Sequence, residues 1–262
     1  MPLEPSSVLL TDRVAVVTGA AVGIGRAIAL AYARFGADLA ICDRDQEHLD
    51  ELATEIEGLG RRVVTGVLDV RAGEPVQQFV ADVDFEFHRV DVLVNNAGGG
   101  FQAPFLDVND KGQDALVREN FTSVTNFIRA CVPLMPDPAG GSIINVTSIE
   151  AHRAAPGFAV YGAMKTAVMG LTKTLALELG PRMVRVNCIA PDVIPTPGIG
   201  TDFGERTPIP IAGHVDDCAG AAVFLASELS RFVTGTTIHV DGGNLAAAGW
   251  IRNEDGTYGT GA

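Results

Sequence analysis

The sequence lacks the features that mark membrane-spanning, secreted and metal-binding proteins. None of its apolar runs approaches the roughly 20 residues that a membrane-spanning helix needs. The segment Met1–Thr11 has no basic residue and no long apolar stretch, so it does not resemble a secretory signal. The four cysteines are widely spaced and form no CxxC pair, which argues against a metal site or a disulfide framework. We therefore expect a cytoplasmic protein without a metal, whose cysteines are buried free thiols.

Positive charge is also scarce. The chain has 19 Lys and Arg residues against 32 Asp and Glu residues, which gives a formal net charge of −13. Because an acidic surface repels phosphate backbones, we expect no nucleic-acid partner. The 262 residues, of which 47% are hydrophobic, are enough for one sizeable core. An α/β domain of this length often forms a single unit, so we expect residues 1–262 to form one domain.

No internal repeat is visible, and short apolar segments alternate with longer amphipathic ones. Strands that are apolar throughout are typical of a parallel sheet covered on both faces. The pattern predicts an α/β Rossmann fold, a doubly wound parallel sheet of seven strands flanked by helices. The expected strands are 14–18, 39–42, 62–68, 90–94, 142–146, 184–189 and 236–240. Helices are expected at 23–35, around 49–59, from 74 onward, at 113–135, 157–179 and 216–226, with a Pro/Gly-rich loop at 191–213.

The segment Thr18–Gly25 (TGAAVGIG) joins the first expected strand to the first expected helix. Glycines let the backbone approach a pyrophosphate closely, and a helix N-terminus supplies free N–H groups and a partial positive charge. Taken alone, the segment could be an ordinary Gly-rich turn. Its place between a strand and a helix favours a dinucleotide site. The expected contacts are Thr18, Gly19, Gly23, Ile24 and Gly25.

Asp43 lies at the end of the second expected strand, 24 residues after Gly19. An acidic side chain there can accept hydrogen bonds from the adenosine ribose hydroxyls and repels a 2′-phosphate. Arg44, which follows it, could instead favour a phosphate. Because a carboxylate so close to a 2′-phosphate is costly, we expect NAD as the cofactor rather than NADP.

Tyr161 and Lys165 are four residues apart, which places both on one face of a helix. A phenol with a pKa of about 10 is a poor base near neutral pH. A neighbouring ammonium group would favour the phenolate and so lower this pKa. Alone, such a pair is more often a packing and surface feature than a catalytic one.

Further motifs make the pattern specific. They are TGAAVGIG at 18–25, NNAG at 95–98, Asn120, Ser148, YGAMK at 161–165 and PDVIPT at 191–196, all in one order. Ser148 precedes Tyr161 by thirteen residues. With these motifs in register over about residues 10–243, the chain closely resembles the classical short-chain dehydrogenase/reductase family.

The resemblance implies a role for each matching position. Tyr161 would be the general acid/base that exchanges a proton with the substrate oxygen, and Lys165 would lower its pKa and hold the nicotinamide ribose. Ser148 would hydrogen-bond the substrate oxygen. Asn120 would hold a water that links Lys165 to solvent. The other implied cofactor contacts are Asp69, Val70, Asn96, Ala97, Gly98, Pro191, Ile194 and Thr196.

The implied reaction is hydride transfer between NAD(H) and a small-molecule secondary alcohol or ketone, which needs no metal. Candidate substrates are a hydroxysteroid or other alicyclic alcohol, a 3-hydroxyacyl thioester or a sugar. Residues at about 10–150 would form the cofactor-binding half, and those at about 151–262 would supply the catalytic helix, the substrate loop and the C-terminal part. Family members commonly form homotetramers or dimers through the two long helices and the last strand. The alternative is a catalytically weak, NAD-sensing binding protein on the same fold.

The sequence departs from the family pattern near the expected substrate. Asp192 stands where the family usually has glycine, and its carboxylate could read a substrate hydroxyl or point outward. The segment after Thr196 looks short and proline-rich, so we expect a stiff lid and an open pocket. The other residues expected at the pocket or its mouth are Ser148, Glu150, His152, Arg153 and Phe158, although His152 could equally be a surface residue.

Overall fold

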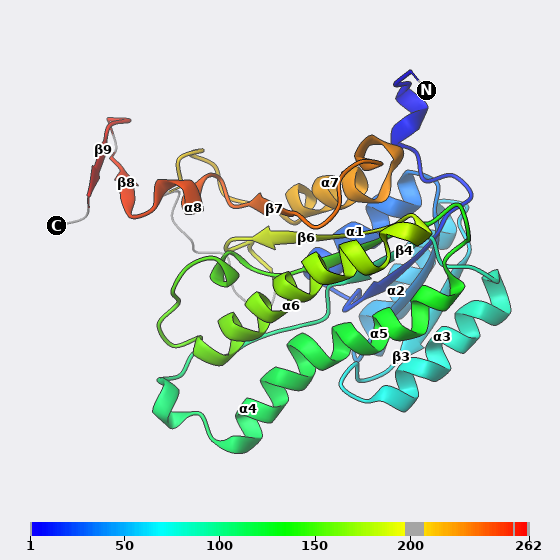
Figure 1. Cartoon of the computed structure of the whole chain (residues 1–262), viewed down its shortest axis with the longest axis horizontal. Coiled ribbons are helices and arrows are strands. Elements are labelled where there is room, and N and C mark those ends of the chain that lie inside the picture. Colours follow the sequence, from blue (N-terminus) through cyan, green and yellow to red (C-terminus); the bar gives the residue numbers. More distant parts are fainter. Residues whose placement is uncertain (1, 197–206, 254, 261–262) are drawn as a thin grey trace.

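A parallel sheet of seven strands organises the protein, whose computed structural model describes residues 2–196, 207–253 and 255–260 (Figure 1). The strand order is β3-β2-β1-β4-β5-β6-β7, which confirms the predicted doubly wound sheet. The order reverses between β1 and β4, and ligands of such sheets bind beyond the carboxyl ends of the strands at this point. The strands are β1 (Val14–Thr18), β2 (Asp38–Asp43), β3 (Val63–Val67), β4 (Val92–Asn95), β5 (Gly141–Val146), β6 (Val184–Pro191) and β7 (Thr237–Val240).

Helices cover both faces of the sheet. One face packs against α1 (Gly23–Arg34), α2 (Gln46–Gly58) and α7 (Val215–Ala226). The other packs against α3 (Gly73–Phe87), α5 (Ser123–Cys131) and α6 (Ala159–Glu178), and α4 (Asp110–Val117) precedes α5. Beyond β7, the short helix α8 (Asn244–Ala247) leads to a hairpin of β8 (Trp250–Arg252) and β9 (Tyr258–Thr260) that extends away from the sheet (Figure 1). No helix among the described residues combines the length and the apolar character needed to cross a membrane.

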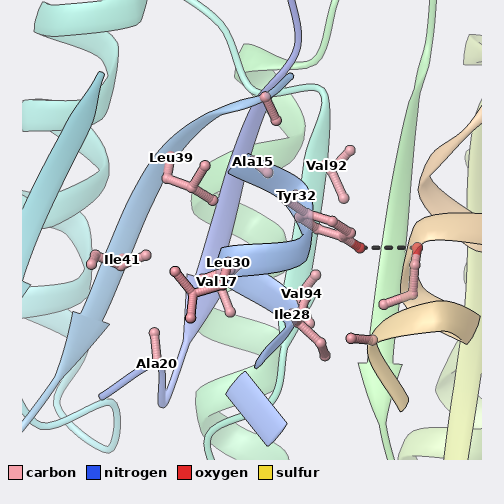
Figure 2. Packing of buried hydrophobic residues seen from close by; sticks show 14 of the residues in the cluster. Ala15, Val17, Ala20, Ile28, Leu30, Tyr32, Leu39, Ile41, Val92 and Val94 are labelled. Carbon is pink, nitrogen blue, oxygen red and sulfur yellow. Dashed lines mark hydrogen bonds between the residues drawn. The ribbon is translucent and has the colours of Figure 1, made fainter. Parts of the chain in front are cut away.

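The apolar sequence of β1 explains how the sheet holds both layers together. All five of its residues are buried. Because successive side chains of a strand point to opposite faces, Ala15 and Val17 join the core beneath α1, whereas Val14 and Val16 join the core beneath α3 and α5. Figure 2 shows the first of these cores. Since both cores share one sheet, we propose that the chain forms a single domain.

The helix predicted at 113–135 is interrupted in the structure. It begins earlier, at Asp110, because the Asn109 side chain accepts a hydrogen bond from the N–H of Gly112 at 2.9 Å and caps the first turn. A π-helical turn, Arg118–Thr122, separates α4 from α5, and a 3₁₀ turn, Val132–Leu134, follows α5. Asn120 lies within the π turn. The predicted helix 157–179 is also slightly shorter, at Ala159–Glu178.

Tyr32 of α1 provides a test of how the first core is joined. Its ring is fully buried, and its hydroxyl donates a hydrogen bond to the carbonyl oxygen of Ala222 in α7 at 3.1 Å (Figure 2). We expect Tyr32→Phe to lower the free energy of unfolding by about 1 kcal/mol, because the buried hydrogen bond is lost. Chemical denaturation measures the change. The control Tyr258→Phe removes an exposed hydroxyl and should change stability by less than about 0.5 kcal/mol. Equal stabilities for the two variants would contradict this account.

Candidate active site

The glycine loop after β1 touches the end of β4 backbone to backbone. A Cβ atom on Gly25 would lie 2.1 Å from the Gly19 carbonyl oxygen and 2.5 Å from Nδ2 of Asn96. Gly19 itself has a φ of +64°, and a Cβ atom there would lie 2.8 Å from Cα of Ala97. These positions exclude any side chain, so glycine is required by the close approach itself.

Hydrogen bonds lock this contact. Nδ2 of Asn96 donates to the carbonyl oxygens of Thr18 at 3.1 Å and Gly19 at 2.9 Å. In return, Oγ1 of Thr18 accepts from the backbone N–H groups of Asn96 at 3.1 Å and Ala97 at 3.0 Å. The two predicted cofactor motifs therefore form one unit at the point where the strand order reverses. The side chains of Thr18 and Asn96 shape the loop, which leaves backbone groups to meet a dinucleotide.

The Asp43 carboxylate lies against this loop, as its place in the sequence predicts. Its Oδ2 accepts from the N–H of Ala21 at 3.0 Å, and its Oδ1 accepts from the N–H groups of Arg44 at 2.6 Å and Asp45 at 3.2 Å. Three backbone donors thus fix the carboxylate at the carboxyl end of β2, where an adenosine ribose would reach it.

Asp69 and Val70 lie beyond β3. The Asp69 carboxylate pairs with Arg71 at 2.6 Å, and the Arg71 hydrogen bonds hold the pKa of this carboxyl below its usual value. The Val70 side chain is buried. Asp69 therefore already has a cationic partner. Nothing in the sequence indicated Arg71 as that partner.

Asn120, Lys165 and Gly98 converge beyond the contact between the glycine loop and the end of β4. Asn120 is fully buried; its Nδ2 donates to the carbonyl oxygens of Gly99 at 2.8 Å and Leu116 at 3.0 Å. A Cβ atom on Gly98 would lie 2.9 Å from Oδ1 of Asn120 and 3.0 Å from Nζ of Lys165. The π turn thus lets Asn120 reach the segment after β4, and Gly98 leaves room for the Lys165 ammonium.

Ser148, Tyr161 and Lys165 lie together at the carboxyl end of β5. Nζ of Lys165 donates to the carbonyl oxygen of Val146, the last residue of β5, at 3.0 Å, and lies 5.6 Å from the centre of the Tyr161 ring. Oγ of Ser148 accepts from the N–H of Glu150 at 3.2 Å, and the Ser148 hydroxyl is near enough to Tyr161 to lower the pKa of its phenol.

Burial is the largest influence on the pKa values of Tyr161 and Lys165. Burial raises the pKa of Tyr161; the Ser148 hydroxyl lowers it and the Glu150 charge raises it further. Burial also lowers the pKa of Lys165, to about 8. Burial thus has the largest effect on the Tyr161 pKa, and the role of Lys165 in lowering it, together with a bound nicotinamide, stays a prediction.

Asp192 is neither solvent-facing nor free. Its carboxylate accepts from Nδ2 of Asn244 in α8 at 2.5 Å and lies 3.4 Å from Nη2 of Arg153. The same Nη2 atom donates to Glu150 at 3.0 Å. The sequence indicated Glu150, Arg153 and Asp192 separately, but nothing in it indicated Asn244. We call these four residues the acidic network.

His152 packs against β7 rather than standing free on the surface. Its ring meets that of His239 edge-to-face, with centres 4.4 Å apart, and its Nε2 is buried without a hydrogen-bond partner among the described residues. Burial lowers the pKa of His152, and the neighbouring His239 and Lys173 lower it further. Phe158 packs edge-to-face on Tyr161 at 6.2 Å.

A cavity of about 380 Å³ opens beyond the carboxyl ends of β6 and β7. Asp192, Ile194 and His239 line it, and the Ile194 side chain is buried. Thr196 approaches the glycine loop, since its Cγ2 would lie 3.1 Å from a Cβ atom on Gly23. The lid predicted after Thr196 falls mostly at 197–206, outside the described residues.

The four cysteines are buried and free, as predicted. Across residues 2–196, 207–253 and 255–260, no group of three or more His, Cys, Asp or Glu side chains is arranged to hold a metal ion.

The close backbone approach predicts the effect of one methyl group. We expect Gly25→Ala to push the loop from β4, lower the free energy of unfolding by about 1–3 kcal/mol and weaken NAD binding at least about tenfold. Denaturation and calorimetric titration measure the two effects. Gly58→Ala, in α2 with no atom within 4 Å of the added methyl, should instead raise stability by about 0.5–1 kcal/mol. Unchanged NAD affinity in Gly25→Ala would refute the expectation.

Comparisons with known proteins agree with this geometry. A family model described as Enoyl-(Acyl carrier protein) reductase matches residues 19–244. The chain is 38% identical over 242 residues to the 3-oxoacyl-[acyl-carrier-protein] reductase FabG of Thermotoga maritima, covering 89% of this chain and 98% of that protein. It is similar to the structure of a 7α-hydroxysteroid dehydrogenase complexed with NADH and 7-oxo glycochenodeoxycholic acid (TM-score 0.88, 29% identity, 92% of this chain and 98% of that chain).

A second similar structure is that of a gluconate 5-dehydrogenase from Burkholderia cenocepacia J2315 in complex with NADP and tartrate (TM-score 0.86, 33% identity, 92% of this chain and 98% of that chain). The matches span nearly the whole chain and agree with the sheet, the glycine loop and the order of the motifs. The chain therefore belongs to the short-chain dehydrogenase/reductase family, whose members are oxidoreductases acting on CH–OH and ketone groups.

Proposed function

We propose that this chain is an NAD(H)-dependent oxidoreductase that transfers a hydride between the nicotinamide and a small-molecule secondary alcohol or its ketone. The convergence of Ser148, Tyr161 and Lys165 at the end of β5, beside the glycine loop, carries this proposal. The Val146 carbonyl holds Lys165 and the Glu150 N–H holds Ser148, while the segment after β4 packs against Lys165 and Tyr161. The three groups are therefore held in a fixed relation. A site that only senses a dinucleotide would not need a proton-transfer group next to a hydroxyl donor.

The residues fit an acid–base role around one substrate oxygen. The Ser148 hydroxyl is near enough to Tyr161 to act on its pKa, so both hydroxyls can address the same oxygen, Ser148 as a donor and Tyr161 as the group that exchanges its proton. An oxidised nicotinamide, when bound, supplies the hydride acceptor and a positive charge. Since burial raises the Tyr161 pKa, that charge together with Lys165 would have to offset the desolvation. Burial of Lys165 beside Asn120 keeps its ammonium close enough to act.

The Tyr161 hydroxyl is the direct test of this chemistry. We expect Tyr161→Phe to reduce the turnover of secondary alcohols by about 10²–10⁴-fold, because the proton can no longer be transferred, while NAD still binds. NADH absorbance over a panel of secondary alcohols measures turnover, and calorimetric titration measures binding. Tyr258→Phe, on the distant hairpin, serves as the control and should keep full turnover. If the native chain binds NAD but oxidises none of the alcohols, and its Tyr161→Phe variant behaves alike, the NAD-sensing alternative gains.

We also propose that the cofactor is NAD rather than NADP. The similar structures include one with NADH and one with NADP, so family membership does not decide the matter. The Asp43 carboxylate, fixed by three backbone donors beside the glycine loop, supports NAD, because a 2′-phosphate would meet a held negative charge. Arg44 is adjacent but cannot move that carboxylate away without losing these hydrogen bonds.

Removing the Asp43 carboxylate should therefore shift the cofactor preference. We expect the ratio of NADP to NAD affinity to rise at least about tenfold in Asp43→Ala, because the repulsion is lost and Arg44 remains. Titration of both nucleotides measures the ratio. Asp50→Ala removes an exposed acid one turn into α2 and should leave the ratio unchanged. Tighter binding of NADP than of NAD by the native chain would contradict the proposal.

The oligomeric state, the location and the substrate class stay predictions. We propose a homo-oligomer, a dimer or tetramer, formed through α4–α5, α6 and the edge strand β7; the exposed Leu177 of α6 and the unpaired edge of β7 are compatible with this. We propose a cytoplasmic location and a substrate of the hydroxysteroid, alicyclic-alcohol or 3-hydroxyacyl type.

A further inference from the structure

The acidic network pairs its guanidinium with its own carboxylates. Nη2 of Arg153 is shared by Glu150 at 3.0 Å and Asp192 at 3.4 Å. The two carboxylate side chains are only 20% and 10% exposed, against 35% for Arg153. Because these side chains are partly buried, water and salt screen their charges less than they screen the charges of exposed side chains. The guanidinium is therefore held by acids of the protein itself.

A third carboxylate makes the balance negative. Asp241 follows β7, lines the same cavity as Asp192 and acts electrostatically on Arg153. It accepts hydrogen bonds from the N–H groups of Gly243 at 3.0 Å and Leu245 at 2.8 Å at the start of α8, and among the described residues no Lys or Arg side chain forms an ion pair with it. Three carboxylates thus face a single guanidinium at the substrate end.

The network also reaches the reacting groups. Glu150 lies two residues after Ser148 and donates its backbone N–H to Oγ of Ser148 at 3.2 Å. Its carboxylate acts on Tyr161 through space. A substrate whose oxygen lies between Ser148 and Tyr161 must therefore place its neighbouring groups within the field of Glu150, and those that extend into the cavity approach Asp192.

We infer, on the basis of the proposed oxidoreductase function, that Glu150 and Asp192 select the substrate by charge and confine the enzyme to uncharged secondary alcohols and ketones. Substrates that bring a carboxylate or phosphate into the cavity beside Asp192 are rejected, because Arg153, which could have bound them, is already paired. Asp192 in place of the usual glycine adds one of the two carboxylates responsible. This separates the chain from the similar gluconate 5-dehydrogenase, whose structure contains tartrate, a dicarboxylate.

A pair of probes that differ only in charge tests the inference. They are 4-hydroxycyclohexanecarboxamide and 4-hydroxycyclohexanecarboxylate, which are nearly isosteric. In the native enzyme we expect kcat/KM for the amide to exceed that for the acid by about 100-fold, because an anion a few ångströms from uncompensated carboxylates is strongly disfavoured. In Glu150→Gln/Asp192→Asn, the ratio should fall to about threefold or lower, since the repulsion is gone and Arg153 is released.

Two further variants keep the result interpretable. Asp192→Asn alone retains a side-chain oxygen for Asn244 and leaves the Glu150–Arg153 pair intact, so it should fold normally and give an intermediate ratio. Glu86→Gln is the matched control, because Glu86 also pairs with an arginine, Arg62 at 3.3 Å, but on α3, away from the site. Its ratio should equal the native one.

The same comparison can be made without turnover, which separates this inference from the proposed function. The alcohol forms of both probes are titrated into the enzyme–NADH complex, where they have no hydride acceptor, and binding is followed by NADH fluorescence. Preferential binding of the amide with no oxidation of any alcohol would contradict the proposed function but support charge selection. The inference is overturned if the native protein turns over or binds both probes equally, if it binds the acid better or neither probe, or if the double variant keeps the native ratio.

Discussion

The contact between the glycine loop and the end of β4 is the constraint on which the site depends. A methyl group on Gly25 would lie 2.5 Å from Nδ2 of Asn96, and one on Gly19 would lie 2.8 Å from Cα of Ala97. This contact brings β1 and β4 together where the strand order reverses, and the exchange of hydrogen bonds between Thr18 and Asn96 makes it rigid. A dinucleotide site built in this way uses little side-chain chemistry. Its specificity must therefore come from neighbouring residues such as Asp43.

The same close packing continues into the proposed catalytic cluster. Gly98 follows the β4 contact, and the space that its missing side chain leaves is bordered by Asn120 and the Lys165 ammonium. The π turn widens the helix locally, which lets Asn120 bond to Gly99 as well as to Leu116 in its own helix. Such turns often occur at functional sites, because the irregular backbone redirects a side chain. The glycine loop and the proposed proton-transfer group are thus parts of one packed unit, so a disturbance at Gly25 should affect the position of Lys165.

How far the sequence predicts this structure depends on the distance between interacting residues. The strand β1 follows from five consecutive apolar residues, and the glycine loop follows from a motif of eight residues. The π turn could not be predicted, because the apolar periodicity over 113–135 is that of an ordinary helix and the partner of Asn120, Gly99, is 21 residues away. The raised pKa of Tyr161 was missed for a similar reason, since burial is a property of the assembled fold.

The residues at the expected substrate end show most clearly what the sequence alone could not predict. Asp192 is visible as a departure from the family pattern, but its partner Asn244 lies 52 residues further along the chain and has no distinguishing neighbours. A carboxylate at this position has opposite consequences according to its partners: a free one could bind a substrate hydroxyl, whereas one that holds Arg153 removes the only guanidinium of the acidic network from substrate binding. The reaction type therefore follows from local motifs, and the choice of substrate follows from which charges the fold has already paired.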